Sequence, residues 1–146
     1  MDESAFRQSM AAAIERPCSF EKAVLSRCVS CARSERVQIA ERELVSCQTL
    51  ASLSRCKELH LHLRHAFTFA LGKPDVSVPL PHALEKRVQC GGLQGIQYVL
   101  NDRSEIEDVD ALLDSTLQQW GALADIPYSE VVHAAARNYK GRHGGS

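Results

Sequence analysis

The segment TLASLSRCKELHLHLRHAFTFAL, residues Thr49–Leu71, carries the clearest helical pattern in the chain. Its leucines recur at helical spacing and form one apolar face, made of Leu50, Leu53, Leu59 and Leu63. Thr49 or Ser52 can cap the first turn, and Gly72 with Pro74 ends the helix. Its second part, Leu59–Leu71, is the richest apolar run of the chain, but its histidines and Arg64 make it unfit to span a membrane.

Helical patterns also flank this segment on both sides. Ser104 and Glu107 resemble a capping box for a helix through Trp120, and Gly91 with Gly92 is expected to break another helix. Lys73–Pro81 holds three of the five prolines and is expected to connect the two halves. The remaining expected helices are Ser4–Glu15, Ser19–Cys31, His82–Gln89, Leu93–Leu100 and a last one opened by Pro127 and Ser129.

One segment, Ser34–Ser46, fits two structures. Val37 and Ile39 alternate with polar residues as in a short strand, whereas Glu41 and Arg42 suit a helix that continues through Val45. We favour the helix. The fold class that follows is all-α, a single-domain bundle of about five to seven helices over residues 1–146. Its parts are a Cys-rich half (1–72), a helical half (82–140) and a flexible tail (141–146).

The composition is that of an ordinary globular chain. The 146 residues are 45% hydrophobic and 24% charged, which allows a substantial core and argues against general disorder. A formal net charge of −1 gives no electrostatic reason to bind nucleic acid or an anionic membrane. The first 13 residues begin with Asp2 and Glu3 and lack the pattern of a secretory signal, so we expect a cytoplasmic protein with reduced thiols.

The cysteines are the chemically informative residues. Five of the six lie within the first 56 residues: Cys18, Cys28, Cys31, Cys47 and Cys56. Clustered thiols in such a chain more often bind metals than form disulfides. Cys28 and Cys31 form a C-x2-C pair, and Cys18 and Cys47 would join them if the intervening chain folded back as a hairpin. Cys47 and Cys56 can share a site only if the long helix begins after Cys47.

Two metal centres fit these spacings. An iron–sulfur cluster, slightly preferred, would use Cys18, Cys28, Cys31 and Cys47, with Cys56 as a substitute. Zinc is the alternative, bound by the two short pairs Cys28/Cys31 and Cys56/His60. His62 and His65 are better read as a solvated helix face than as ligands.

Three readings without a metal also remain open. The cysteines can be small buried core residues, and Cys28 continues the apolar face of Phe20 and Val24. They can also form a redox pair. Cys90, before Gly91 and Gly92, would lie at the positive end of a helix if one began after the glycines, where a thiolate is stabilised.

The sequence therefore predicts a small protein with a cysteine-ligated metal centre. Its expected role is electron transfer, redox sensing or metallo-enzyme assembly with a protein partner, not catalysis on an organic substrate. The rival hypothesis is a metal-free helical module that binds a partner protein and uses its cysteines as core residues.

Overall fold

The computed structural model describes residues 16–72 and 79–138, and this part of the chain is mostly helical with one two-stranded hairpin. The prediction of a helical protein is thus confirmed, but the fold is not purely all-α. The expected helix Ser4–Glu15, the tail 141–146 and most of the Lys73–Pro81 connection lie outside the described residues.

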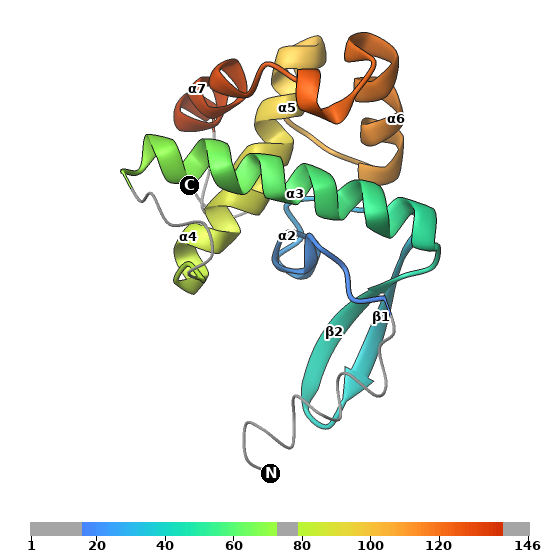
Figure 1. Cartoon of the computed structure of the whole chain (residues 1–146). Coiled ribbons are helices and arrows are strands. Elements are labelled where there is room, and N and C mark those ends of the chain that lie inside the picture. The colour runs from blue at the N-terminus through green and yellow to red at the C-terminus, as the bar shows by residue number, and fades with distance from the viewer. Residues whose placement is uncertain (1–15, 73–78, 139–146) are drawn as a thin grey trace.

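The long helix α3 (Leu50–Ala70) is the axis of the fold and agrees with its predicted bounds to within one residue. Three leucines of its predicted apolar face are buried, but Leu50 is 68% exposed, so its assignment to that face is wrong. Thr49 is the N-cap, and its hydroxyl accepts a hydrogen bond of 3.2 Å from the backbone N–H of Ser52. The helix stops just before Gly72, which adopts a φ of 71° that glycine reaches without strain. Figure 1 shows α3 crossing the whole molecule, with α5, α6 and α7 on one side and α2 on the other.

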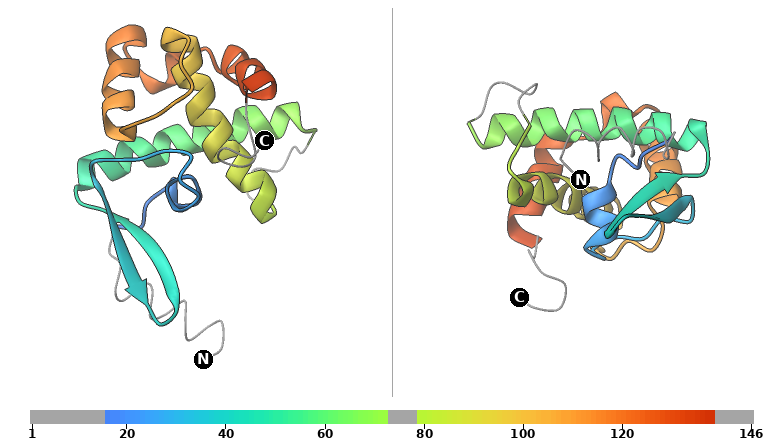
Figure 2. Two further views of the ribbon diagram at one scale, coloured as in Figure 1. Left: turned by 180° about the vertical axis from the view of Figure 1, so that it is seen from behind. Right: turned by 90° about the horizontal axis from the view of Figure 1, so that it is seen from below.

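The predicted helix over Ser34–Ser46 is wrong, because this segment forms an antiparallel hairpin of β1 (Ser34–Ile39) and β2 (Arg42–Cys47). Two features favour strands here. Val45 is completely buried against the core. The outer edge of β2 is covered by the chain around Pro17, where Cys18 N–H donates to Val45 O (2.9 Å) and Cys47 N–H donates to Arg16 O (2.7 Å). The hairpin projects away from the helices (Figures 1 and 2).

Helix α2 (Glu21–Leu25) is much shorter than the expected helix Ser19–Cys31. Phe20 occupies the N-cap position, so Ser19 is not the cap. The chain leaves the helix at Ser26 and turns through Arg27, whose φ is 64°. Cys28 therefore does not extend the helical face of Phe20 and Val24, and the C-x2-C pair lies in irregular chain.

The second half begins with one continuous helical path rather than two helices. Helix α4 (His82–Lys86) passes through a single π-helical turn, η1 (Arg87–Gly91), into α5 (Gly92–Asn101). The predicted break at Gly91 and Gly92 is wrong. Gly92 instead permits close packing, because a Cβ there would lie 2.7 Å from Cδ1 of Leu63 on α3.

Helix α6 (Val109–Trp120) ends at the predicted residue but starts later than expected. Its N-cap is Asp108, whose carboxylate accepts from the Asp110 N–H (3.1 Å), so the proposed Ser104 cap is wrong. A short 3₁₀ turn, η2 (Leu123–Asp125), leads to the predicted last helix, α7 (Tyr128–Asn138).

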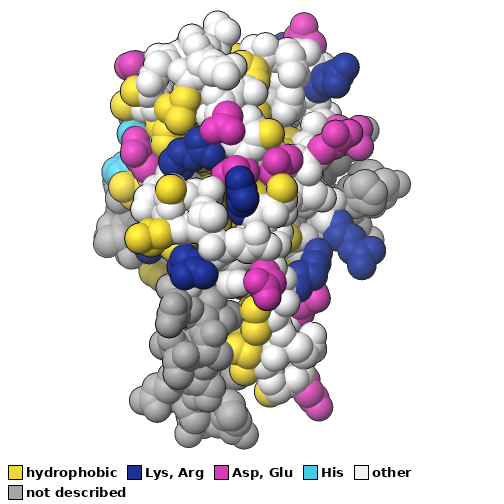
Figure 3. All heavy atoms as spheres, turned by 90° about the vertical axis from the view of Figure 1, so that its right-hand side faces the viewer, with side chains coloured by type: hydrophobic (Ala, Val, Ile, Leu, Met, Phe, Trp, Pro, Cys, Tyr) yellow, Lys and Arg dark blue, Asp and Glu magenta, His cyan; other side chains and the backbone are white. Residues whose placement is uncertain are grey.

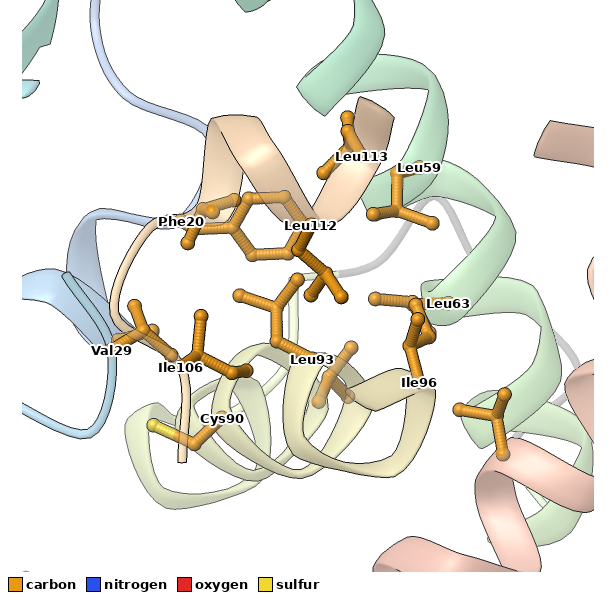
Figure 4. Packing of buried hydrophobic residues seen from close by; sticks show 14 of the residues in the cluster. Phe20, Val29, Leu59, Leu63, Cys90, Leu93, Ile96, Ile106, Leu112 and Leu113 are labelled. Atoms are coloured by element: carbon orange, nitrogen blue, oxygen red, sulfur yellow. The ribbon is translucent and has the colours of Figure 1, made fainter. Parts of the chain in front are cut away.

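One apolar core joins these helices. Leu59 and Leu63 of α3 face Leu93 and Ile96 of α5, and residues of α6 close the space between them (Figure 4). Phe20 enters this core from the N-cap position of α2 and is almost fully buried. Within the described part of the chain, no helix is both long enough and apolar enough to cross a membrane.

Candidate metal centre

Four free cysteines line a single small cavity at the junction of the hairpin with α3 and α6. The cavity has a volume of about 20 Å³. Its cysteines are Cys18, Cys31, Cys47 and Cys56. All four belong to the set of five predicted from the sequence, and the fifth, Cys28, does not line the cavity.

Each of the four cysteines lies in a different segment of the chain. Cys18 lies in the segment that pairs with β2, and Cys31 precedes β1. Cys47 is the last residue of β2 and is 8% exposed. It precedes the N-cap of α3, so the condition under which Cys47 and Cys56 can share a site is met. The hairpin register then places Cys47 opposite Ser34, close to Cys31 in sequence.

Backbone N–H groups near two of these sulfurs act to lower the pKa of the thiols. The Phe20 N–H acts on Cys18 and those of Arg33 and Asp110 on Cys31, although the Asp110 N–H also donates to the Asp108 carboxylate (3.1 Å). In both cases a donor lies two residues after the cysteine. Hydrogen bonds from such groups stabilise a thiolate relative to a thiol, because they strengthen when the acceptor is charged.

Burial nevertheless holds these groups in the thiol form when no cation is present. Burial raises the pKa of Cys18 to about 11 and that of Cys56 to about 12. Repulsion from the neighbouring cysteine sulfurs is a smaller contribution to both raised pKa values. The pKa of Cys31 is also raised, first by burial, despite its two N–H donors. A cation entering the cavity would reverse this balance and displace the protons.

Asp110 of α6 lines the cavity and is hydrogen-bonded to α3 and to the segment after Cys31. Its carboxylate accepts hydrogen bonds from the Ser52 hydroxyl (2.8 Å) and from the guanidinium groups of Arg55 (2.8 Å) and Arg33 (3.3 Å). Burial alone would raise the pKa of Asp110, but these three donors outweigh burial and hold the pKa below its ordinary value. The carboxylate is therefore ionised at neutral pH. It links α6 to α3, which carries Cys56, and to the segment after Cys31.

Cys28 and Cys90 form a disulfide across 62 residues of sequence. Cys90 is completely buried in the core, whereas Cys28 is partly exposed. The helix runs continuously through Cys90, so the expected helix start that would stabilise its thiolate is not there. Figure 4 shows Cys90 on the helical path next to Ile106.

His60, the proposed fourth zinc ligand, lies in a different network. Its Nε2 is 2.7 Å from the Glu85 carboxylate, and its ring packs edge-on against Phe20. Gln89 also donates to Glu85 (2.8 Å), and its side-chain oxygen accepts from the Ala23 N–H (3.1 Å). The structure thus does not bring His60 together with Cys56 as a ligand pair.

The four thiols are not arranged as ready ligands of one ion. In residues 16–72 and 79–138, no three His, Cys, Asp or Glu side chains form a group that could hold a single metal ion. A mononuclear site would require the sulfurs to move closer together, or the centre would need more than one metal atom.

Sequence reasoning missed Asp110 and the two arginines beside it. Asp110 lies far from the cysteines along the chain, and no motif relates it to them. The only available signal was its position in the first turn of an expected helix.

The chain matches no protein-family model, no curated protein and no solved structure.

Proposed function

We propose that this protein binds a metal centre through Cys18, Cys31, Cys47 and Cys56 and acts in electron transfer, redox sensing or metallo-enzyme assembly. The supporting observation is the convergence of four reduced cysteines, from four separate segments, on one cavity. Cys28 is left out of the ligand set because a sulfur engaged in a disulfide offers no thiolate.

An iron–sulfur cluster is the first candidate. Zinc–sulfur bonds of 2.3 Å in a tetrahedron place the sulfurs about 3.8 Å apart, and no three candidate ligands in the described part of the chain form such a group. In a cluster the four thiolates are shared among several irons and can lie farther apart. The wider arrangement of the thiols therefore suits a cluster better than one ion.

Zinc is the second candidate, and the size of the cavity favours it. About 20 Å³ is room for a single water molecule or ion. A cluster would need the lining side chains to move outward. Such a zinc centre would be structural, with four protein ligands and no open position for a substrate.

The size of the cavity also supports a role other than catalysis on an organic molecule, because ligand pockets for such molecules are generally ten or more times larger. A protein partner would then supply or receive the electrons or the metal. Figure 3 shows basic and acidic side chains interspersed over the face viewed there, which fits a partner other than nucleic acid.

A cytoplasmic location stays part of the proposal, since free thiols persist in reducing compartments. The Cys28–Cys90 disulfide is unusual for that location. Complete burial of Cys90 limits the access of reducing thiols to its sulfur.

The rival function is a metal-free helical interaction module. It is favoured by one observation: Cys90 belongs to the core, and Cys18, Cys31 and Cys56 pack against that core. Under this hypothesis the thiols contribute only apolar area.

The deciding experiment is purification of the untagged full chain without oxygen, followed by a visible spectrum and quantification of iron, zinc and sulfide in one sample. A cluster gives brown protein with near-stoichiometric iron and sulfide. A zinc site gives colourless protein with one zinc per chain.

Matched variants separate the cavity thiols from the other two cysteines. Cys31→Ser and Cys56→Ser should lose the metal, whereas the double variant Cys28→Ser, Cys90→Ser should keep it. Protein that holds no iron or zinc after anaerobic purification, and binds neither on reconstitution, would refute the metal centre and leave the interaction module.

A further inference from the structure

A second hollow adjoins the thiol cavity and shares Val24, Cys31 and Ser34 with its lining. Its volume is about 330 Å³, and it is more open and more polar than the thiol cavity. Val24 and Val29 contribute apolar surface, and Ser30 and Ser34 contribute hydroxyl groups. Cys31 lines both spaces, so a molecule in this hollow would touch a residue of the candidate metal centre.

Two arginines face this hollow, and none of its lining residues in the described chain is acidic. The Arg36 guanidinium is held in place by Glu43 (2.9 Å) and by the Val24 carbonyl (3.3 Å). Glu43 offsets the charge of Arg36, but not that of Arg27. Within the described residues, the Arg27 guanidinium makes no hydrogen bond or ion pair.

The backbone at Arg27 adds a further observation. Its φ of 64° lies in the left-handed region, which costs a residue with a Cβ about 1 kcal/mol or more. Glycine would avoid this cost, yet an arginine occupies the position. The turn directs the chain from α2 past the hollow and leaves the guanidinium at its edge.

From these observations we propose that the hollow binds the carboxylate or phosphate group of a small anionic molecule. Arg27 supplies the unpaired charge, and Arg36 supplies a guanidinium already fixed by its own contacts. The Ser30 hydroxyl can donate to one of the remaining oxygens, whereas the Ser34 hydroxyl already donates to the Cys31 carbonyl (2.8 Å). A guanidinium binds such groups through two parallel N–H donors. The proposal does not require the metal centre, although the anion would bind next to it.

The test uses inorganic phosphate and, separately, acetate, added to ¹⁵N-labelled full-length protein at constant ionic strength maintained with chloride. We expect saturable amide shifts concentrated in residues 27–36. Arg27→Gln should weaken the binding about tenfold or more, because it removes a charged hydrogen-bond donor. Stronger binding of phosphate than acetate would identify a phosphate ligand, and the reverse order a carboxylate ligand.

Arg103→Gln is the matched control, since Arg103 is also an exposed arginine but lines a different hollow. It should leave the affinity unchanged. Shifts that do not saturate, shifts spread over the whole surface, or an equal loss in both variants would overturn the proposal. The titration is done on metal-free and metal-loaded protein, so failure of the metal centre and failure of the anion site are scored separately.

Discussion

Asp110 lines the thiol cavity and is hydrogen-bonded to side chains of two other segments. Its carboxylate accepts hydrogen bonds from Ser52 and Arg55 of α3 and from Arg33 in the segment after Cys31. These bonds fix the distance between the segments that carry Cys31 and Cys56. Outer residues of this kind orient metal ligands and influence affinity even though they never touch the metal.

Asp110→Asn keeps the shape of the side chain and removes its charge. We expect a loss of about 1–2 kcal/mol in the free energy of unfolding, near the low end for charged hydrogen bonds because Arg33 is half exposed. The lowered pKa of Asp110 means that its contribution is present above about pH 4 and is lost as the pH falls through the folded-state pKa. Urea unfolding should therefore show the two proteins converging below pH 4, and a constant difference would contradict this role.

The buried thiols should react slowly in the metal-free protein. With pKa values of about 11 and 12, Cys18 and Cys56 have very little thiolate at pH 8. From the thiolate fractions we expect iodoacetamide to label Cys18 about a hundredfold, and Cys56 about a thousandfold, more slowly than in the chain unfolded in urea. Mass spectrometry of peptides measures each rate. Labelling of Cys56 as fast as in the unfolded chain would show that the cavity is open.

At the scale of elements, the hairpin determines whether the thiols meet. It returns the chain from Cys31 to Cys47, and a helix over the same residues would carry Cys47 away. The sequence misleads here because both structures are locally acceptable: Val37 and Ile39 alternate, but the charged residues around the turn suit a helix. Tertiary contacts favour the strands over a helix: Val45 is buried, and β2 pairs with the chain around Pro17.

The turn of the hairpin offers a stabilising substitution. Ala40 has a φ of 54°, in a two-residue turn where glycine is the usual residue. Ala40→Gly should stabilise the protein by about 0.5–1 kcal/mol, because the strain of the Cβ exceeds the added chain entropy. Thermal unfolding measures the change, and Ala51→Gly, in the first turn of α3, should have the opposite sign. A lower melting temperature for Ala40→Gly would show that the turn is formed differently.

Packing of α5 provides a second test at this scale. A Cβ at Gly95 would lie 2.5 Å from the backbone oxygen of Val131 on α7, whereas a Cβ at Gly92 would meet only the flexible end of Leu63. Gly95→Ala should therefore cost about 1–3 kcal/mol and Gly92→Ala less. Chemical denaturation of both variants checks the order, and equal costs would contradict the close approach of α5 to α7.

For the whole molecule, the Cys28–Cys90 disulfide joins the two halves of the chain. It closes a loop of 62 residues, which in the chain-entropy account corresponds to about 4 kcal/mol of stability. The double variant Cys28→Ser, Cys90→Ser should lose roughly 2–4 kcal/mol relative to the oxidised protein. Urea unfolding of wild-type protein with and without a reductant is the control. No change in either comparison would mean that the bond does not form.

The parts of the fold that could be predicted are those decided by local sequence. The limits of α3 follow from Thr49 and Gly72, and the end of α6 was placed correctly at Trp120. The disulfide could not be predicted, because its two cysteines are related only through the folded chain. The continuous helix through Gly91 and Gly92 could not be predicted either. Glycine weakly favours a helix break, but here the close packing of Gly92 against Leu63 outweighs that preference. The C-x2-C pair is misleading, since Cys28 forms a disulfide whereas Cys31 is a free thiol that lines the cavity.

The order of synthesis determines when Cys28 and Cys31 become chemically different in the growing chain. All four cavity cysteines have been made once Cys56 is added, but Cys90 and Asp110 come later. At about 5–20 residues per second, Cys90 follows Cys56 by roughly 2–7 s and Asp110 by roughly 3–11 s. During those seconds the nascent chain presents Cys28 as a fifth free thiol, three residues from Cys31. Cys28 therefore remains an available metal ligand until Cys90 has been synthesised and can form the disulfide with it.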